Sequence, residues 1–162
     1  MGRITDALRD VVRRVSSTVR SAEGNTARTT RRAAPRTRAV ETGVRIEYRP
    51  ALDGDPDPGE VVWTWVPFED DPTLGKDRPV VIIGRHGDEL SGVALTTKRS
   101  DRFETVEVGT GPWDSRGRPS YAKVGRLLDI DPSDVRREGA VLNRRRFDTV
   151  IQAVDRLHDV VR

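Results

Sequence analysis

Apolar residues recur at two different periods along this chain, and each period predicts one kind of structure. In residues 3–19 they stand three and four positions apart, which is typical of an amphipathic helix. From Val44 onward they alternate with polar residues, which is typical of half-buried strands. The pattern therefore predicts a basic helix within residues 1–20 and a folded domain in residues 43–162.

Residues 21–42 separate these two parts and consist mostly of Ser, Thr, Ala and Arg. A segment with so few large apolar side chains buries too little surface to offset the entropy of ordering it. We therefore expect a flexible basic linker between the helix and the domain.

Six segments of the domain are rich in β-branched, apolar and aromatic residues, as strands are. They are residues 44–49, 60–68, 79–84, 90–97, 103–108 and 121–130. In residues 60–68 apolar side chains fall on both faces, which predicts a central strand covered on both sides. Several short strands at this spacing favour a small barrel and a mainly β fold.

The chain is expected to end in a helix over residues 144–161, whose apolar residues again stand three and four positions apart. Asn143 is the expected N-cap, and His158 is expected to act at the end of the helix. Three arginines, residues 144–146, fill the first turn, where each cation opposes the helix dipole by roughly 0.3–1 kcal/mol. A bound polyanion would relieve this conflict; the alternative is that solvent and salt screen the three charges.

Charge is distributed unevenly along the chain, although the net charge is only +3. Residues 1–40 hold ten arginines against three acidic residues, and the remaining residues hold 19 basic and 23 acidic groups. A basic arm on a mildly acidic domain favours binding to a polyanion, either nucleic acid or anionic lipid. The N-terminal helix can lie on a membrane surface, dock in a groove of another protein or pack on its own domain.

Composition excludes several kinds of chemistry. The chain has no cysteine, which rules out disulfides, thiolate zinc sites and a cysteine nucleophile. No apolar run approaches the ~20 residues that span a bilayer, and the N-terminus lacks the apolar core of a secretory signal. The motifs of P-loop proteins, zinc proteases and serine hydrolases are absent from the sequence. We expect a cytoplasmic protein.

The most distinctive polar segment is residues 69–79, EDDPTLGKDRP, in which Arg78 precedes Pro79. Proline at the start of a strand removes no ladder donor, so Arg78 is expected at the rim of the sheet. Residues 96–98, Thr-Thr-Lys, end the next predicted strand. If these strand ends meet, a guanidinium fork lies beside hydroxyl donors, which is a site for a phosphate. The alternative is that Arg78 pairs with a carboxylate of residues 69–71.

In order and spacing, three segments resemble the PemK/MazF family of toxin ribonucleases: DPGEVVWTWVPF, DPTLGKDRPVVIIG and VALTTKRS. The likeness covers residues 55–100 and continues more loosely through RREGAVLNRRRFDTVIQAV, while residues 1–54 lie outside it. It implies a small SH3-like barrel with a C-terminal helix, usually a homodimer, that a small antitoxin inhibits. It also implies cleavage of single-stranded RNA without a metal or cofactor, by attack of a ribose 2′-OH on the adjacent phosphate.

The resemblance also implies roles for individual residues. By position, Arg78 matches the family's arginine before proline, and Thr96 and Thr97 match its hydroxyl pair. Attack on the phosphate builds negative charge, which Arg78 would stabilise while a threonine orients the phosphate. The acidic pair that many relatives carry has no equivalent in residues 120–130, which leaves the general base open. The candidates, in order, are Asp77, His86 and Tyr121.

Basic residues near this predicted site are expected to bind the RNA backbone. They are Lys76, Lys98, Lys123 and Arg126. Trp113, in the glycine-rich loop 109–120, can stack on an unpaired base or serve as a buried anchor of its loop. The competing function is a non-catalytic barrel that binds nucleic acid or a protein, with the basic arm supplying affinity.

Overall fold

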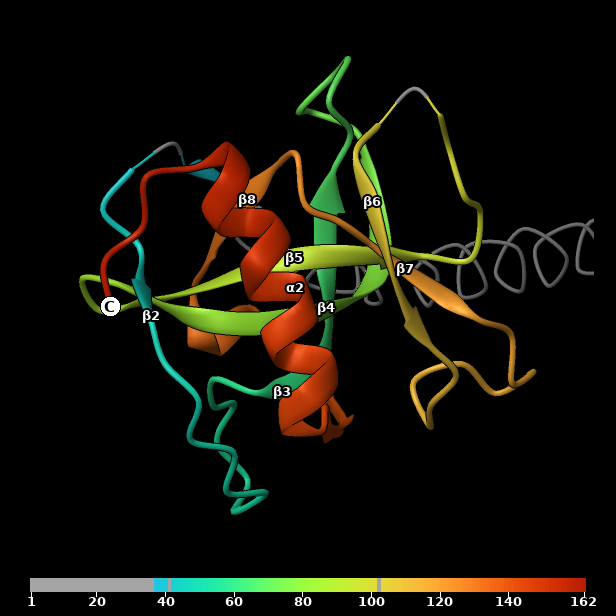
Figure 1. Ribbon diagram of the computed structural model, residues 1–162, viewed down its shortest axis with the longest axis horizontal. Coiled ribbons are helices and arrows are strands. Elements are labelled where there is room, and N and C mark those ends of the chain that lie inside the picture. Colours follow the sequence, from blue (N-terminus) through green and yellow to red (C-terminus); the bar gives the residue numbers. More distant parts are fainter. Residues whose placement is uncertain (1–36, 41, 102) are drawn as a thin grey trace, which may run out of the picture. The chain divides into compact units, whose positions relative to one another are not determined.

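The computed structural model describes residues 37–40, 42–101 and 103–162 (Figure 1). The predicted N-terminal helix and most of the predicted linker lie outside these residues. In the described part of the chain no helix is long and apolar enough to cross a membrane.

The described residues form a mainly β fold with one C-terminal helix, as expected. The strands are β1 (Arg38–Val40), β2 (Arg45–Ile46), β3 (Glu60–Pro67), β4 (Gly75–His86), β5 (Glu89–Thr96), β6 (Thr105–Gly109), β7 (Ser120–Lys123), β8 (Leu127–Ile130) and β9 (Arg137–Val141). A short 3₁₀ helix, η1 (Pro132–Asp134), precedes β9, and the helix α2 (Arg144–Leu157) follows it.

The named strands of the described residues pair antiparallel, and the main path through the sheet runs β1-β8-β5-β4-β3-β9. Off this path, β2 pairs with β4, β7 pairs with β5, and β6 pairs with β7. The consecutive strands β3, β4 and β5 are direct neighbours, so two hairpins form the centre of the sheet.

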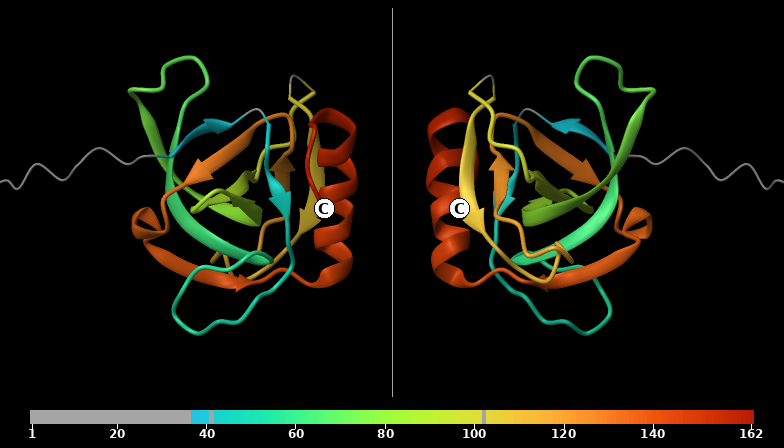
Figure 2. Two further views of the ribbon diagram at one scale, coloured as in Figure 1. Left: turned by 90° about the vertical axis from the view of Figure 1, so that its left-hand side faces the viewer. Right: turned by 90° about the vertical axis from the view of Figure 1, so that its right-hand side faces the viewer.

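Two apolar clusters cover opposite faces of this centre. One cluster packs beneath α2, which lies along one side of the sheet (Figure 2), and includes Val61, Val81 and Phe147. The other includes Val62 and Val80 from the alternate positions of the same two strands. Because successive strand residues point to opposite faces, β3 supplies both clusters. The prediction of a central strand with two apolar faces is confirmed.

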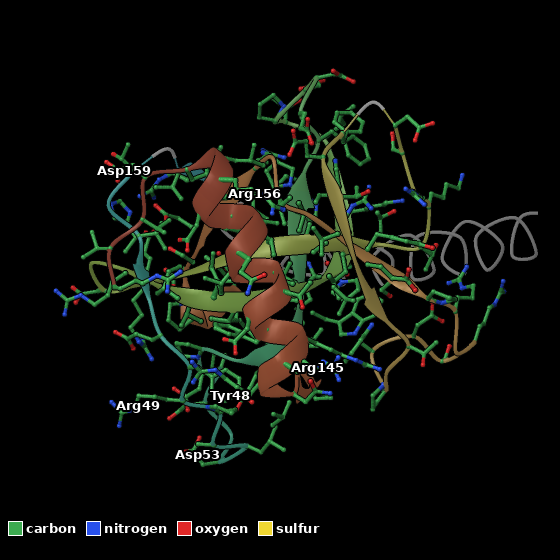
Figure 3. All side chains as sticks on the ribbon, viewed as in Figure 1. Tyr48, Arg49, Asp53, Arg145, Arg156 and Asp159 are labelled. Carbon is green, nitrogen blue, oxygen red and sulfur yellow. The ribbon has the colours of Figure 1, made fainter. Side chains whose placement is uncertain are left out.

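The capping of α2 agrees with the sequence. Asn143 is the N-cap, and its side chain accepts a hydrogen bond from the backbone N–H of Arg146 at 3.0 Å. Two of the first-turn arginines find partners within the chain: Arg144 pairs with Asp148 at 2.9 Å, and Arg146 donates to the carbonyl of Thr110 at 2.8 Å. Arg145 is exposed at this end of the helix (Figure 3). These contacts relieve part of the dipole conflict without an external polyanion.

The predicted C-terminal end of the helix, residue 161, is wrong, because α2 ends at Leu157 and His158 is its C-cap. The imidazole Nε2 of His158 lies 2.7 Å from the carbonyl oxygen of Val124. Val161 is extended instead: its backbone bonds to Val44 and Ile46 of the β2 region at 2.8 Å each. A long-range backbone contact thus ends the helical pattern early.

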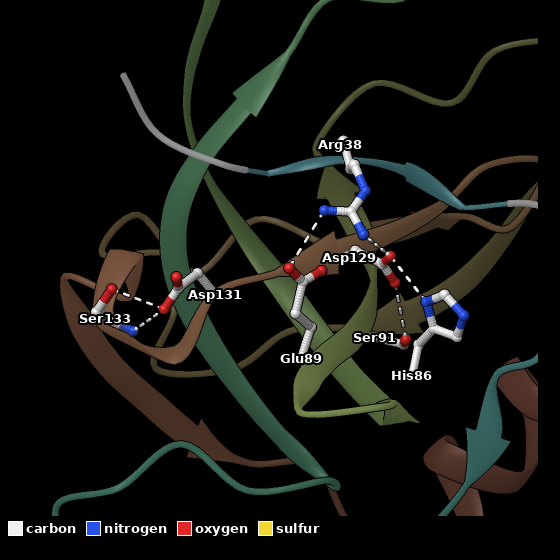
Figure 4. Close-up of polar contacts among 7 residues, drawn as sticks. All are labelled: Arg38, His86, Glu89, Ser91, Asp129, Asp131 and Ser133. Carbon is white, nitrogen blue, oxygen red and sulfur yellow. Dashed lines mark hydrogen bonds and ion pairs between the residues drawn. The ribbon is translucent and has the colours of Figure 1, made fainter. Parts of the chain in front are cut away.

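The folded domain also begins before residue 43, because β1 lies in the predicted linker and pairs with β8. Arg38 anchors it by ion pairs to the buried carboxylate of Asp129 at 3.1 Å and to Glu89 at 3.2 Å (Figure 4). Asp129 also accepts from Ser91 at 3.4 Å and lies 2.9 Å from His86. These partners are distant in sequence, so the local composition of the segment does not reveal them.

Phe147→Ala tests the cluster beneath α2. The side chain is 2% exposed, so its truncation should lower the free energy of unfolding by about 3–5 kcal/mol in chemical denaturation. Leu157→Ala, at a residue 40% exposed on the same helix, should change it by less than about 0.5 kcal/mol. Equal effects of the two substitutions would contradict the described packing.

Candidate functional site

A groove opens in the sheet where β4 and β5 part. Their ladder runs from His86↔Glu89 to Val80↔Ala94, and no further pair between the two strands follows. Beyond Ala94, β5 pairs with β7 instead. The next residue of β4 towards its start is Pro79, which has no backbone N–H to donate to a neighbouring strand. The divergence therefore leaves the first residues of β4 facing the end of β5 across open space.

The groove has a volume of about 710 Å³ and is lined by residues from β3, from β4, from the end of β5 and from the loop that leads into β7. From β4 and the end of β5 come most of the residues predicted from the sequence: Lys76, Asp77, Arg78, Thr96, Thr97 and Lys98. Further lining residues come from the loop of residues 112–118. If the β4–β5 register continued, Arg78 would stand opposite Thr96 and Lys76 opposite Lys98. The parted ladder thus brings the predicted arginine and hydroxyls into one concave site.

The strand β4 is longer than predicted, because residues 75–78 extend its ladder with β3 as far as Pro67↔Gly75. Arg78 consequently lies within a strand, opposite Thr64, rather than at the end of a loop. A strand backbone on a central hairpin holds the side chain more rigidly than a loop would.

Arg78 is partly buried, and among the described residues no carboxylate forms an ion pair with it. Burial lowers the pKa of its guanidinium, while the charge of Glu69 raises it in part. Arginine nevertheless stays charged, so its donors require an anion or water. Of the three alternative partners, Glu69 pairs with Lys123 at 2.6 Å and Asp71 accepts from Thr73 at 2.6 Å, while Asp70 is exposed. Arg78 is therefore a partly desolvated cation that faces the groove.

Two lysines add to this positive charge. The pKa of Lys76 is lowered, chiefly by the charge of Arg78, then by burial and by the charge of Lys98. Arg78 and Lys98 thus disfavour the charged form of Lys76, so an anion bound among the three cations would relieve the repulsion.

The carboxylates that line the groove have their own cations. Asp77 forms an ion pair with Arg136 at 2.6 Å, and Asp114 pairs with Arg118 at 2.9 Å. The backbone N–H of Arg116 is the first cause of the lowered pKa of Asp114, and Arg118 adds to it. These ion pairs leave the groove with a net positive charge. Among the described residues, that charge lies on Lys76, Arg78 and Lys98.

The two threonines offer hydroxyl groups at the end of β5. Thr96 Oγ1 accepts a hydrogen bond from the backbone N–H of Lys98 at 3.2 Å, which fixes the turn that leaves the strand. This contact uses an acceptor lone pair, so the hydroxyl hydrogen can still be donated to a ligand. Thr97 is exposed at the rim of the groove.

Of the three candidate bases, Asp77 alone lines the groove. His86 lies at the far end of β4 and contacts the buried Asp129, so its prediction as a base is wrong (Figure 4). Tyr121 stands opposite Thr96 in the β5–β7 ladder but does not line the groove. Arg136, the partner of Asp77, was not predicted from the sequence, because the ion pair joins residues 59 positions apart.

Trp113 is a structural residue, which corrects its prediction as a base-stacking platform. It is 3% exposed, belongs to the apolar cluster beneath α2, and donates from Nε1 to Ser120 Oγ at 3.0 Å. A Cβ on Gly111 would approach the indole to 2.2 Å, so the loop packs tightly over the ring. The alternative of a buried loop anchor is the one that the structure supports.

Lys123 and Arg126 do not line this groove, contrary to their predicted grouping with the other cations. They line a smaller pocket of about 170 Å³, and Arg78 is the residue that both hollows share. Lys123 is held by Glu69 and lies 4.3 Å above the ring of Phe103. Arg126 donates to the carbonyl of Pro67 at 2.7 Å. These contacts brace the loop between β3 and β4.

No group of three or more His, Asp and Glu side chains among the described residues is arranged to hold a metal ion.

The sequence matches a family model for the PemK-like, MazF-like toxin of type II toxin-antitoxin systems over residues 57–158. This match spans more than half of the chain, so the chain belongs to that family. The strands β1 and β2 precede the matched segment.

Three solved structures are similar at low identity. The Mycobacterium tuberculosis toxin MazF-mt6 is 17% identical with a TM-score of 0.44, covering 60% of this chain and 94% of that one. An endoribonuclease from a mycobacterial species is 15% identical with a TM-score of 0.44, covering 66% and 94%. A MazE-MazF structure from Deinococcus radiodurans is 16% identical with a TM-score of 0.46, covering 63% and 94%. No curated protein matches the sequence.

Arg78→Ala should raise the pKa of Lys76, because it removes the positive charge that most disfavours the charged ammonium. The measurement is an NMR titration of the lysine side chains. Arg85→Ala is the control, since Arg85 lies at the other end of β4 and pairs with Asp57. A Lys76 pKa that stays the same in Arg78→Ala would contradict the described cluster of cations.

Proposed function

We propose that this protein is a toxin endoribonuclease that cleaves single-stranded RNA in the groove between β4 and β5. The observation that carries the proposal is the position of Arg78: it is partly desolvated, lies in a groove with two further cations, and has hydroxyls on the facing strand. A phosphodiester supplies the anion that this arrangement lacks, and arginine binds phosphate oxygens through a planar fork of donors. Family membership supports the same reading.

The proposed reaction needs no metal or cofactor. The ribose 2′-OH gives its proton to a base and its oxygen attacks the adjacent phosphorus. The bond to the 5′-oxygen of the next nucleotide breaks, and this oxygen takes a proton from water, which yields a 2′,3′-cyclic phosphate and a 5′-OH end. Negative charge grows on the phosphoryl oxygens as the fifth bond forms. Arg78 would stabilise that charge and Thr96 or Thr97 would orient the phosphate, because preorganised donors act most strongly where charge develops.

Asp77 is the proposed general base, since it is the carboxylate that lies on the same strand segment as Arg78 and lines the groove. Its Oδ2 is bonded to Arg136, so Oδ1 is the oxygen that would take the proton of the 2′-OH. Arg136 would then be a positioning residue that fixes the direction of the carboxylate.

The ion pair between Asp77 and Arg136 also favours a second function, which is RNA binding without cleavage. If Arg136 holds Asp77 away from the RNA, the groove binds single-stranded RNA without cleaving it. Lys76, Arg78 and Lys98 would then supply affinity through phosphate contacts, and the basic arm would add to them.

The proposed partners follow from the family rather than from a contact within this chain. We propose that a small antitoxin inhibits the protein by covering the groove, with acidic side chains that meet its three cations. The protein is proposed to act as a cytoplasmic homodimer. Contact of the N-terminal helix with a membrane stays an alternative role for the arm.

Arg78→Ala should lower the rate of RNA cleavage by at least about 100-fold, because one preorganised donor to the developing charge is worth that much. The assay follows a single-stranded RNA in EDTA and identifies cyclic-phosphate ends. Arg85→Ala should cleave as fast as the parent protein. Arg78→Ala that cleaves at the parental rate would remove Arg78 from the mechanism.

Asp77→Asn separates the two functions. A general base contributes about 10²–10⁴-fold, so cleavage should fall by that factor while affinity for a non-cleavable 2′-O-methyl RNA is kept. The matched control is Asp88→Asn, at an exposed turn residue outside the groove. Parental cleavage by Asp77→Asn would dismiss Asp77 as the base, and an inactive parent that binds RNA would favour the second function.

A further inference from the structure

The smaller pocket on the other side of Arg78 has features that phosphate binding does not explain. Its inner wall is apolar and is formed by Val66, Ala94 and Leu128. Two phenylalanines stand at its mouth: Phe68 is 37% exposed and Phe103 is 39% exposed. Large apolar side chains left in water at a concave site are typical of ligand-binding surfaces.

The size of the pocket limits what it can hold. A volume of about 170 Å³ is below the roughly 300–1,000 Å³ of pockets that enclose a drug-sized ligand. One flat ring system fits this space better than a long chain does. Aromatic walls bind such rings by stacking, which depends little on the identity of the base.

Two carboxylates, Glu69 and Asp70, and three cations, Arg78, Lys123 and Arg126, line the pocket. The carboxylate of Glu69 is paired through Oε1 with Lys123, so it does not repel a nucleic acid as a free acid would. Its second oxygen has no hydrogen bond among the described residues, and a carboxylate oxygen accepts from an amino group on the edge of a base. The apolar wall and this acceptor together suit a ring with polar edges.

Arg78 joins this pocket to the groove, because its side chain lines both. A phosphate on Arg78 therefore lies at the entrance of the pocket. In a single strand, the base of the adjacent nucleotide is close enough to be turned out of the stack and into such a hollow. Because Arg78 lines both hollows, a nucleotide can place its phosphate in the groove and its base in the pocket. The pocket therefore suits a nucleotide better than it suits the side chain of a protein partner.

We propose that this pocket is a base subsite, which takes the nucleobase next to the phosphate held by Arg78. Phe68 and Phe103 stack on the base, and Glu69 accepts from its amino edge. Lys123 and Arg126 hold the loop between β3 and β4 in place and are not backbone contacts. This inference rests on the proposed RNA substrate, and it adds a determinant of where the RNA is bound.

Binding of non-cleavable RNA tests the subsite. The probes are 2′-O-methyl adenine hexamers that carry one abasic residue at each position in turn, with affinity measured by fluorescence anisotropy. For the parent protein, one position should be most sensitive, with a loss of about 5- to 150-fold, as expected for one stacked base. Phe103→Ala and Phe68→Ala should weaken the intact hexamer and reduce the penalty of that abasic residue.

Leu74→Ala is the matched control, since Leu74 is 57% exposed on the same hairpin loop but does not line the pocket. It should leave both affinities unchanged. Arg78→Ala should weaken all hexamers alike, because it removes a phosphate contact. An undiminished abasic penalty in both phenylalanine variants would overturn the subsite, and so would a parent protein that binds no hexamer.

The base subsite and the nuclease function can fail independently of each other in these experiments. A protein that shows this coupling but never yields cyclic-phosphate ends keeps the subsite and loses the catalytic function. A protein that cleaves RNA while both phenylalanine variants keep the parental abasic penalty loses only the subsite.

Discussion

The divergence of β4 from β5 beyond Val80 and Ala94 is the constraint on which the functional site depends. Each strand continues its ladder with a different neighbour, β4 with β3 and β5 with β7, so both remain hydrogen-bonded while the space between them opens. Two apolar clusters on opposite faces hold the central hairpin rigid. A site built on such strands keeps its side chains within the narrow geometry that phosphate recognition requires.

The groove between β4 and β5 carries unpaired positive charge. Carboxylates around it are paired with cations from other segments, Glu69 with Lys123 and Asp77 with Arg136. Arg78, by contrast, is partly desolvated with no such partner among the described residues, and its charge lowers the pKa of Lys76. The fold thus keeps a positive site unpaired for an external anion, and the same arginine also lines the apolar pocket beside it.

Local patterns in the sequence predicted the features that depend on neighbouring residues. Alternation identified β3 and its two apolar faces, and the Asn143 cap placed the start of α2. Order along the chain brought Arg78, Thr96 and Thr97 together as a candidate phosphate site, although their roles remain proposals. Features fixed by distant partners were missed: β1 depends on Arg38 and Asp129, and the orientation of Asp77 depends on Arg136. The sequence left Trp113 open between a base-stacking and a buried role, because the exposure of a loop residue cannot be derived from a glycine-rich composition.

In the proposed function, Arg78 holds a backbone phosphate of the RNA between β4 and β5. The most direct measurement is a crystal structure with a short 2′-O-methyl RNA. We expect a phosphate oxygen at roughly 2.7–3.2 Å from the guanidinium of Arg78, which is hydrogen-bond distance, with the hydroxyl of Thr96 or Thr97 on the same phosphate. RNA bound on another surface, such as the exposed end of α2 at Arg145, with the groove free of phosphate, would contradict it.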